Sequence, residues 1–341
     1  MEINIFQIIW FILWGVLWAG YFALDGFDLG AGSLFYILGR KENEKKMIYQ
    51  AIGPFWDGNE VWLITAGGAT FAAFPKAYAI MFSTLYTPLL LLLFSLIFRG
   101  VAVEYRNKYE GPAWQKFWDI FFFLGSLLPP ILLGIAFANI FKGVPIDEKG
   151  ILHTNLFGLL NPYSILGGFL FLFCFATHGA LWLAFKTFGT FSERAANLAK
   201  KLWAISLVLI AVFWIMSLVI TNLWQNYLKT PILLSFPLLT ILVYITVPVF
   251  IQKKNYLKAW IMSALAIIFF TAWGMAGLFP NLFPSSIDPS YSLTIMNSSS
   301  SLLTLKVMTV VAFIFVPVVL VYTFWAYKIF SYRIEGEKMI Y

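Results

Sequence analysis

The stretch "FALDGFDLGAG", residues 22–32, places two aspartates three positions apart inside a strongly apolar segment. Asp25 and Asp28 are the only charged residues between Ile3 and Gly39. This segment is long enough to cross a bilayer as a helix. An ionised side chain at the bilayer centre costs about 2.5–3.5 kcal/mol on insertion scales, so such residues usually face a protein interior and serve a function.

The whole chain has the composition of a protein that lies in lipid. Of its 341 residues, 61% are hydrophobic and only 11% are charged, and the mean hydropathy is +0.82. Soluble domains carry about 25% charged residues. These values predict an all-α polytopic membrane protein. The net charge of +7 does not indicate nucleic-acid binding, because the basic residues lie in short loops.

Apolar runs separated by turn signals predict nine transmembrane helices in one integral membrane unit, residues 1–341. The expected spans are 5–38, 50–73, 77–102, 117–141, 161–187, 202–223, 231–251, 258–280 and 302–330. A linker-like stretch at 143–160 separates a first half of four spans, 1–142, from a second half, 160–330. No segment between spans is long enough for a soluble domain.

The distribution of basic residues predicts the orientation of the chain. Of the 23 lysines and arginines, 17 lie in the odd-numbered loops and the C-terminal segment, and 4 lie in the even-numbered loops. Basic residues accumulate on the cytoplasmic side of a membrane. We therefore expect the N-terminus outside and the C-terminus in the cytoplasm. The N-terminus has no basic region or cleavage site of a signal peptide, so it is interpreted as the first span.

Five ionisable residues of the first three spans are predicted to converge on the cytoplasmic side. They are Asp25, Asp28, Asp57, Glu60 and Arg99. The two aspartates of the first span share a helix face, as do the two acids of the second. Arg99 could hold one or more of the carboxylates ionised. Such a cluster suits a proton-uptake path, and it equally suits a cation site. The alternative is that these groups lie near the interface and only snorkel or cap helices.

A second face of the first span carries small residues only. Ala19, Ala23, Gly26 and Gly30 form this stripe. Small residues let neighbouring membrane helices approach closely. We therefore expect another helix to pack tightly against it.

Ligands for a metal or haem are scarce. The chain has two histidines, His153 in a loop and His178 in the fifth span, and one cysteine, Cys174. A single cysteine excludes an internal disulfide. Cys174 and His178 share a helix face, but two ligands at this spacing are more typical of ordinary packing than of a metal site. The sequence thus predicts no cofactor or metal ligated by this chain, and a partner that holds any catalytic centre.

Four long motifs resemble one family. They are "GYFALDGFDLGAG", "IGPFWDGNEVWLITAGGATFAAFP", "GSLLPPILLGIAFANIFKGVP" and "FPNLFPSS…SLT…SSLLTLKVM". Together they resemble subunit II of the cytochrome bd-type quinol oxidases, including the cyanide-insensitive variants. Residues 188–270 resemble this family only in hydropathy.

The resemblance implies a fold of two four-helix bundles plus one peripheral helix, in the plasma membrane of a prokaryote. It implies a heterodimer with subunit I, which would carry two b-type haems, one d-type or b-type haem and the quinol site. The complex would oxidise quinol and reduce dioxygen to water with cytoplasmic protons, generating a proton-motive force without pumping. The resemblance leaves room for a small single-span accessory subunit.

The resemblance also implies residue roles. Asp28 and Asp57 match positions of the proton path, and Trp62 matches a residue that lines the oxygen channel. Asp25, Glu60 and Arg99 are added to the proton path from the helix geometry above. Lys306 lies outside the recognised pattern, near the outer end of the last span, and is expected only to snorkel.

Two other functions compete with an oxidase subunit. A secondary transporter or ion channel could use the same carboxylates, although no clear inverted repeat is visible in the sequence. A purely structural partner could shield haem from lipid without moving protons. A haem-bearing partner that copurifies with the chain would exclude the first alternative.

Overall fold

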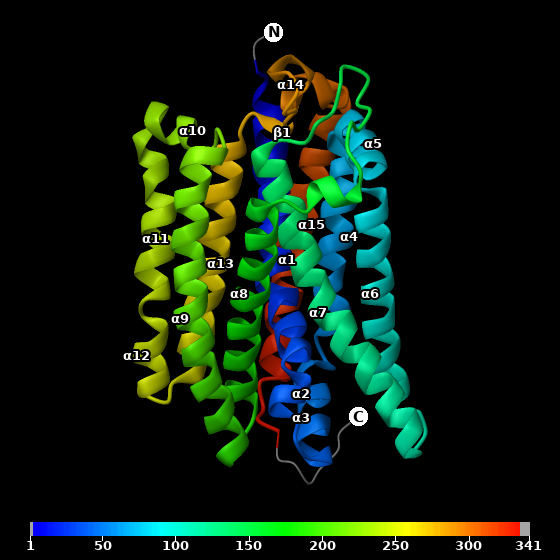
Figure 1. Ribbon diagram of the computed structural model, residues 1–341, viewed down its shortest axis with the longest axis vertical. Coiled ribbons are helices and arrows are strands. Elements are labelled where there is room, and N and C mark those ends of the chain that lie inside the picture. The colour runs from blue at the N-terminus through cyan, green and yellow to red at the C-terminus, as the bar shows by residue number, and fades with distance from the viewer. Residues whose placement is uncertain (1–2, 335–341) are drawn as a thin grey trace.

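The computed structural model describes residues 3–334 as long helices that run side by side (Figure 1). Within this range, eight helical segments are long and apolar enough to cross a membrane. They are α1 (Ile5–Ser33), α6 (Tyr86–Tyr105, continued by η1, Arg106–Lys108), α7 (Pro112–Lys142), α8 (Pro162–Lys186), α9 (Gly189–Ile220), the segment Pro231–Gln252, α13 (Tyr256–Leu278) and α15 (Leu302–Ile329). The chain is therefore an all-α polytopic membrane protein.

The predicted second span corresponds to α4 (Trp56–Ala73), which runs alongside α1 (Figure 1). Its polar first turns make it less apolar than the other eight segments. The predicted start at residue 50 was wrong, because α3 (Glu42–Ile52) occupies that position and lies outside the span. Gly53 and Pro54 follow α3. Pro54 lacks an N–H and cannot donate the next helical hydrogen bond, so α3 ends there and a new helix begins at Trp56.

Prolines divide two of the predicted spans. The third predicted span consists of α5 (Pro75–Thr84) and α6, with Leu85 between them. A continuous helix is disfavoured there because Pro88 lacks an N–H and would clash with the carbonyl of Thr84. In the same way, Pro248 accompanies the break between α11 (Ser235–Tyr244) and α12 (Val247–Gln252).

The predicted loop between the fifth and sixth spans was also wrong. Helix α9 begins at Gly189, whereas the sequence suggested a span that begins at residue 202. The charged residues of this segment lowered its hydropathy and concealed an amphipathic helix. Ala195, Ala196 and Ala199 are buried along one side of it, which is the pattern of a helix that packs on a core.

The remaining elements are short and lie in the connections. They are α2 (Phe35–Leu38), η2 (Leu156–Leu159), α10 (Trp224–Lys229), β1 (Asn281–Phe283), η4 (Pro289–Tyr291), β2 (Leu293–Thr294) and α14 (Ile295–Ser298), whereas η3 (Pro231–Leu234) is the first turn of the segment Pro231–Gln252. The two strands form an antiparallel pair. A bridge between Val144 and Ser285 joins this pair to the linker at 143–160. Two connections that are distant in the sequence therefore form one cap at one end of the molecule.

Helix α1 lies at the centre of the bundle. It contacts α4 and α7 on one side and α8 and α13 on the other (Figure 1). Helix α15 lies at the edge, and only 6% of its apolar window is buried within the chain. Near the N-terminal end of α15, Lys306 Nζ lies 5.7 Å from the ring centre of Phe6.

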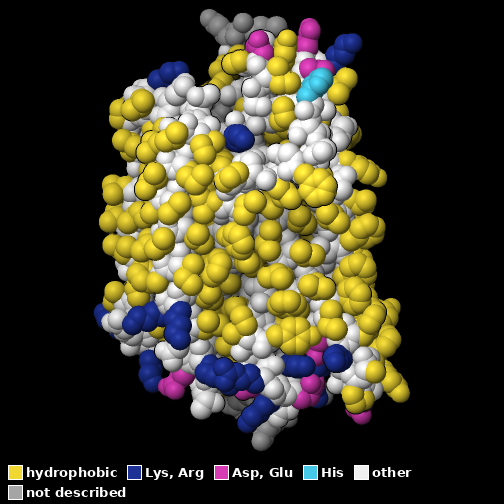
Figure 2. Space-filling view, viewed as in Figure 1, with side chains coloured by type: hydrophobic (Ala, Val, Ile, Leu, Met, Phe, Trp, Pro, Cys, Tyr) yellow, Lys and Arg dark blue, Asp and Glu magenta, His cyan; other side chains and the backbone are white. Residues whose placement is uncertain are grey.

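The surface shows the pattern of a membrane protein. Figure 2 shows apolar side chains over the middle of one face and most of the Lys and Arg side chains at the end that carries α2 and α3. This basic end is the predicted cytoplasmic end. The predicted locations of the N-terminus and the C-terminus concern residues 1–2 and 335–341, which lie outside the described residues.

The predicted small-residue stripe of α1 packs against α8. A Cβ atom added to Gly30 would lie 1.7 Å from the carbonyl oxygen of Phe175, and one added to Gly26 would lie 3.1 Å from the ring of Phe175. On the α8 side, a Cβ atom at Gly179 would lie 2.1 Å from the backbone nitrogen of Ala31. The expectation of close helix packing is therefore confirmed at these glycines.

We expect Gly30→Ala to destabilise the protein, because the new methyl group would meet backbone that cannot move without separating α1 from α8. Overpacking of this kind typically costs about 1–3 kcal/mol. Gly67→Ala is the control, because its Cβ would meet only the tip of Phe82, at 4.0 Å. Thermal unfolding of the purified protein measures both effects. An unchanged unfolding temperature for Gly30→Ala would contradict the close approach.

Candidate functional site

Arg99 is the centre of a buried ion-pair group. Its Nη2 lies 2.8 Å from Asp25 Oδ1 and 2.5 Å from Glu60 Oε1. The side chains of Arg99 and Asp25 have no exposed surface, and that of Glu60 is 20% exposed. These residues come from α6, α1 and α4, so the ion pairs join three helices. The predicted convergence of these three charges is confirmed.

Asp28 lies one turn along α1 from Asp25 and has a different partner. Asn59 Nδ2 donates to Asp28 Oδ2 at 2.6 Å and to the carbonyl oxygen of Leu24 at 3.1 Å. The amide oxygen of Asn59 accepts a hydrogen bond from the hydroxyl of Tyr327 at 3.0 Å. Asn59 therefore bridges α1 to α15. Neither Asn59 nor Tyr327 was predicted to be part of the site.

The group is not balanced in charge. Asp25, Asp28 and Glu60 supply three carboxyl groups, and Arg99 supplies one guanidinium. Within the described residues, Asp28 Oδ1 and the Nε and Nη1 atoms of Arg99 make no hydrogen bond. Surplus negative charge in a buried site is relieved when a carboxyl group binds a proton or when a cation enters. The site can therefore take up positive charge.

Comparison with known proteins identifies the family. The family model of the cytochrome bd terminal oxidase subunit II matches residues 6–330. The chain belongs to the cytochrome bd oxidase subunit II family.

The matches extend over nearly the whole chain. The chain is 38% identical over 331 residues to "Cytochrome bd ubiquinol oxidase subunit 2" of Bacillus subtilis, covering 97% of each protein. It is 36% identical over 371 residues to "Cytochrome bd-I ubiquinol oxidase subunit 2" of Escherichia coli K12, covering 99% of this chain and 98% of the relative.

A solved structure supports the fold alone. A chain of the bd oxidase from Geobacillus thermodenitrificans has a TM-score of 0.79 and 18% sequence identity, covering 96% of this chain and 99% of that one. At this identity the likeness is one of architecture.

In this subunit II chain, Asp57 forms no ion pair with Arg99 within the described residues. It is exposed in the first turn of α4, and its Oδ1 accepts from the backbone N–H of Gly58 at 2.7 Å. Glu60, one turn later, faces inward. No hydrogen bond joins Asp57 to Asp28 or Arg99 in the part of the chain that the structure describes. Asp57 and Glu60 lie one turn apart on α4, but only Glu60 pairs with Arg99.

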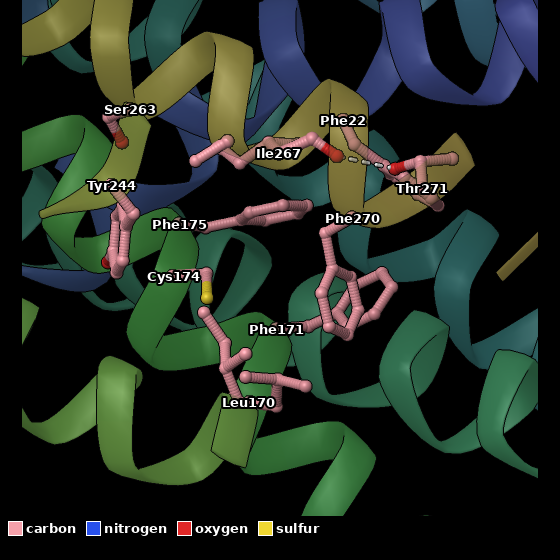
Figure 3. Close-up of a pocket in the computed structure, with 12 residues that line it drawn as sticks. Phe22, Leu170, Phe171, Cys174, Phe175, Tyr244, Ser263, Ile267, Phe270 and Thr271 are labelled. Carbon is pink, nitrogen blue, oxygen red and sulfur yellow. Dashed lines mark hydrogen bonds between the residues drawn. The ribbon is translucent and has the colours of Figure 1, made fainter. Parts of the chain in front are cut away.

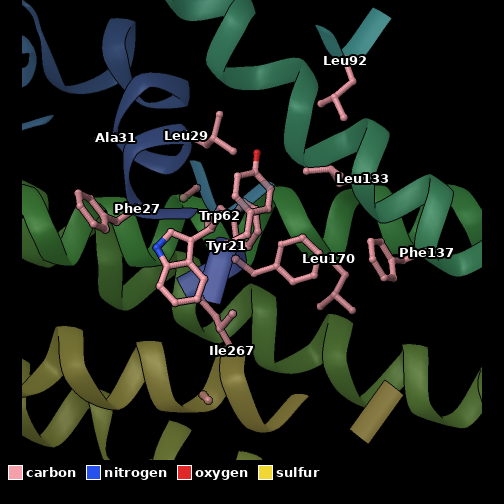
Figure 4. Close-up of a cluster of buried hydrophobic side chains, with 14 of the residues drawn as sticks. Tyr21, Phe27, Leu29, Ala31, Trp62, Leu92, Leu133, Phe137, Leu170 and Ile267 are labelled. Carbon is pink, nitrogen blue, oxygen red and sulfur yellow. The ribbon is translucent and has the colours of Figure 1, made fainter. Parts of the chain in front are cut away.

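Trp62 packs directly on α1. A Cβ atom added to Gly20 would lie 2.5 Å from the indole of Trp62, so only glycine permits this contact. Trp62 is 9% exposed, and it belongs with Tyr21 to the cluster of buried side chains in Figure 4. The residue that was predicted to line an oxygen channel is thus held between α1 and α4.

Each of the two histidines of the subunit II chain interacts with other residues of the same chain. His178 Nε2 lies 3.0 Å from the carbonyl oxygen of Ala23, and its ring stacks on Trp260 with 5.2 Å between ring centres. His153 Nε2 lies 2.8 Å from Asp147 Oδ2 in an exposed connection. Its hydrogen bond to Asp147 is the main reason that the pKa of this carboxyl group is lowered. Among residues 3–334, no three His, Cys, Asp or Glu side chains are arranged to hold a metal ion.

Cys174 lines a small apolar cavity that is formed mostly by the second half of the chain, with Phe22 of α1 also in its wall. The cavity has a volume of about 30 Å³, and its walls include Phe175, Tyr244, Ser263 and Phe270 (Figure 3). One water needs about 10–15 Å³ of such volume. The cavity is therefore too small for a haem or a quinol ring.

A second ion-pair group lies toward the basic end and was missed from the sequence. Arg106 Nε lies 2.6 Å from Asp119 Oδ1, and Lys45 Nζ lies 2.8 Å from Asp119 Oδ2. Glu42 Oε1 pairs with Arg106 Nη2 at 2.7 Å. Asp119 is the only acidic residue in the largely apolar sequence of α7. This isolated carboxyl group could have indicated a buried ion pair. Because each charge has an opposite partner, this group is suited to joining α3, η1 and α7.

A third contact on the same end joins α3 to α9. Glu44 Oε1 accepts from Arg194 Nη2 at 2.8 Å, and its Oε2 accepts from the backbone N–H groups of Arg40 and Lys41. Burial opposes ionisation of Glu44, but these hydrogen bonds together lower the pKa of its carboxyl group. Arg194 also donates to the carbonyl oxygen of Leu38. The α3 segment is thus fixed to the bundle on two sides.

We expect Arg99→Gln to destabilise the subunit strongly. It would leave Asp25 and Glu60 without their common cation, and breaking a buried pair by removing one partner costs about 3–5 kcal/mol. Lys254→Gln is the control, because the Lys254–Glu193 pair is exposed on both sides and such pairs contribute little. Thermal unfolding and yield of the purified protein report the difference. Equal stability of the two variants would mean that the buried pairs are not required for the fold.

Proposed function

We propose that this chain is the haem-free subunit II of a cytochrome bd-type quinol:dioxygen oxidoreductase in a prokaryotic plasma membrane. In this proposal it supports a haem-bearing subunit I and supplies part of the cytoplasmic proton path for reduction of dioxygen to water. The complex would generate a proton-motive force without pumping. The N-terminus would lie outside and the C-terminus in the cytoplasm. The observation that carries the proposal is the buried group of Asp25, Asp28, Glu60 and Arg99 toward the basic end of a family member.

The chemistry of the group supports proton uptake. Glu60 is 20% exposed, whereas Asp25 and Arg99 are fully buried, so the group extends from an accessible carboxyl to inaccessible ones. Asp57, exposed one turn before Glu60, would be the first carboxyl to meet protons from the cytoplasm. Asp28 has one oxygen bound by Asn59 and the other without a partner in the described residues. An oxygen in this state can accept and release a proton without breaking an existing hydrogen bond.

The partners of the two histidines support a haem-free subunit. His178, the buried histidine, directs Nε2 to a backbone carbonyl and lies flat against Trp260. His153 is exposed and paired with Asp147. We therefore assign the two b-type haems and the d-type or b-type haem to subunit I, where they would supply electron transfer and oxygen chemistry. Quinol would also react on subunit I.

The surface of the chain supports a membrane partner. Helix α4 presents Val61, Ile64 and Phe71 at 52%, 71% and 60% exposure. These residues share α4 with Asp57, which also faces outward. A partner that covers this surface would enclose Asp57 and complete a path between the two subunits. We propose subunit I as that partner, with room for a small single-span accessory subunit. Trp62, on the same helix, is proposed to border the oxygen path.

The transporter or channel alternative uses the same carboxylates but predicts no haem-bearing partner. Family membership favours the oxidase subunit. Purification of the chain from its native membrane distinguishes the two. A visible haem spectrum in the copurifying complex supports the oxidase, and a colourless, functional single chain would contradict it.

Asp28→Asn and Asp57→Asn test the proton path. Asn keeps the shape of Asp but cannot titrate. Asp57→Asn should therefore slow quinol-driven oxygen consumption at least tenfold, and Asp28→Asn should slow it less. The haem content of both variants should be unchanged. Asp288→Asn is the control, because Asp288 is exposed in the cap at the opposite end. Oxygen consumption across the pH range measures the effect. Wild-type rates at every pH would show that these carboxylates are not an obligatory path.

His178→Ala and His153→Ala test whether the subunit binds haem. Both variants should keep all haem absorption bands of the assembled complex, because the histidines have protein partners. His178→Ala should lower thermal stability by removing the contact with Ala23 and Trp260, whereas His153→Ala should not. Absorption spectra of the reduced complexes provide the measurement. Loss of one haem band, with the others intact, would assign a ligand to this chain.

A further inference from the structure

Tyr327 connects the last helix to the proposed proton path. Its hydroxyl donates to the amide oxygen of Asn59 at 3.0 Å. Its ring is enclosed by aromatic side chains, with 4.6 Å between ring centres to Phe55, 6.0 Å to Trp182 and 6.4 Å to Trp260. These contacts come from α8, α13 and the turn before α4. The position of the hydroxyl is therefore determined by packing on several elements.

The hydroxyl determines which way the amide of Asn59 points. An amide has one accepting side and one donating side. With its oxygen bound to Tyr327, the amide presents its NH₂ group to Asp28 Oδ2 and to the carbonyl of Leu24. The opposite orientation would direct the amide oxygen at two other acceptors. Without the Tyr327 hydroxyl, the oxygen side of Asn59 loses its donor and the preference for the present orientation is weaker.

Helix α15 is anchored close to Tyr327. The ammonium group of the buried Lys186 donates to the carbonyl oxygens of Phe330 and Tyr332 at 2.5 and 2.6 Å. The backbone N–H of Ile334 donates to the carbonyl oxygen of Lys186 at 2.7 Å. A cation near the end of a helix stabilises its last carbonyl groups. These bonds fix the end of α15 one turn beyond Tyr327.

We propose that Tyr327 is a positioning residue for Asp28. Through Asn59 it keeps one oxygen of Asp28 bound and the other open to proton exchange, and Lys186 anchors the helix that carries it. This inference rests on the proposed function of Asp28. Tyr327 itself transfers no proton to or from Asp28 in this proposal; its hydroxyl acts on Asp28 only through the amide of Asn59.

The experiment is a double-mutant cycle in the assembled oxidase. Tyr327→Phe keeps the ring and removes the hydroxyl, and Asn59→Ala removes the amide. We expect Tyr327→Phe to reduce the rate of oxygen consumption about fivefold, the factor that corresponds to one ordinary hydrogen bond, and to displace its pH profile. Asn59→Ala should displace the profile in the same direction by at least as much. In the Asn59→Ala background, Tyr327→Phe should have no further effect.

The control is Tyr322→Phe, on the same helix. Tyr322 is 63% exposed, and in the described part of the chain its recorded contact is with the ring of Trp325. This variant should keep the wild-type rate and pH profile. Haem content is measured for every variant, so that a loss of assembly is not mistaken for a loss of proton transfer.

Three results would overturn the inference. The first is a wild-type pH profile for Tyr327→Phe while Asn59→Ala and Asp28→Asn are impaired. The second is an equal effect of Tyr327→Phe with and without Asn59, which would indicate an independent role. The third is loss of haem in Tyr327→Phe, which would make the hydroxyl a requirement for assembly. A wild-type profile for Asp28→Asn would instead remove the proposed function itself, and the two failures are thereby distinguished.

Discussion

The buried guanidinium of Arg99 is the constraint on which the rest of the site depends. Two carboxyl groups from different helices meet one nitrogen of this side chain. None of these charges is stable alone in an apolar bundle, and each is tolerated because the others are present. The pairs therefore fix α1, α4 and α6 relative to one another. The position of Asp28 depends on this arrangement of helices, although Asp28 itself does not pair with Arg99.

Helix α1 lies at the centre of the bundle and makes different contacts on two of its faces. One face carries Gly26 and Gly30 and packs against the ring and the backbone of Phe175 in α8. The other carries Asp25 and Asp28 and faces α4 and α6. Close packing on the first face leaves little freedom for the second. The glycines thus contribute to the site indirectly, because they prevent the carboxyl groups from moving away from their partners.

The sequence was sufficient to predict the fold class, most of the spans and the convergence of Asp25, Glu60 and Arg99. These features follow from hydropathy and helix periodicity. The exposure of Asp57 did not follow, because residues one turn apart on a helix can differ in burial where a packed surface ends. Asn59 and Tyr327 were missed for another reason. They are separated by 268 residues, and no local pattern reports a hydrogen bond between helices.

The path of α15 has a consequence for how the protein is made. This helix is synthesised after the other described helices, and little of it is buried within the chain. It is held at one end by the indole of Trp10, which donates to Leu305 and Thr309, and at the other by Lys186. Domains form progressively as the chain leaves the ribosome. Asn59 therefore receives the hydrogen bond from Tyr327 only after α15 has been synthesised, so that a chain truncated before Tyr327 would lack this part of the site.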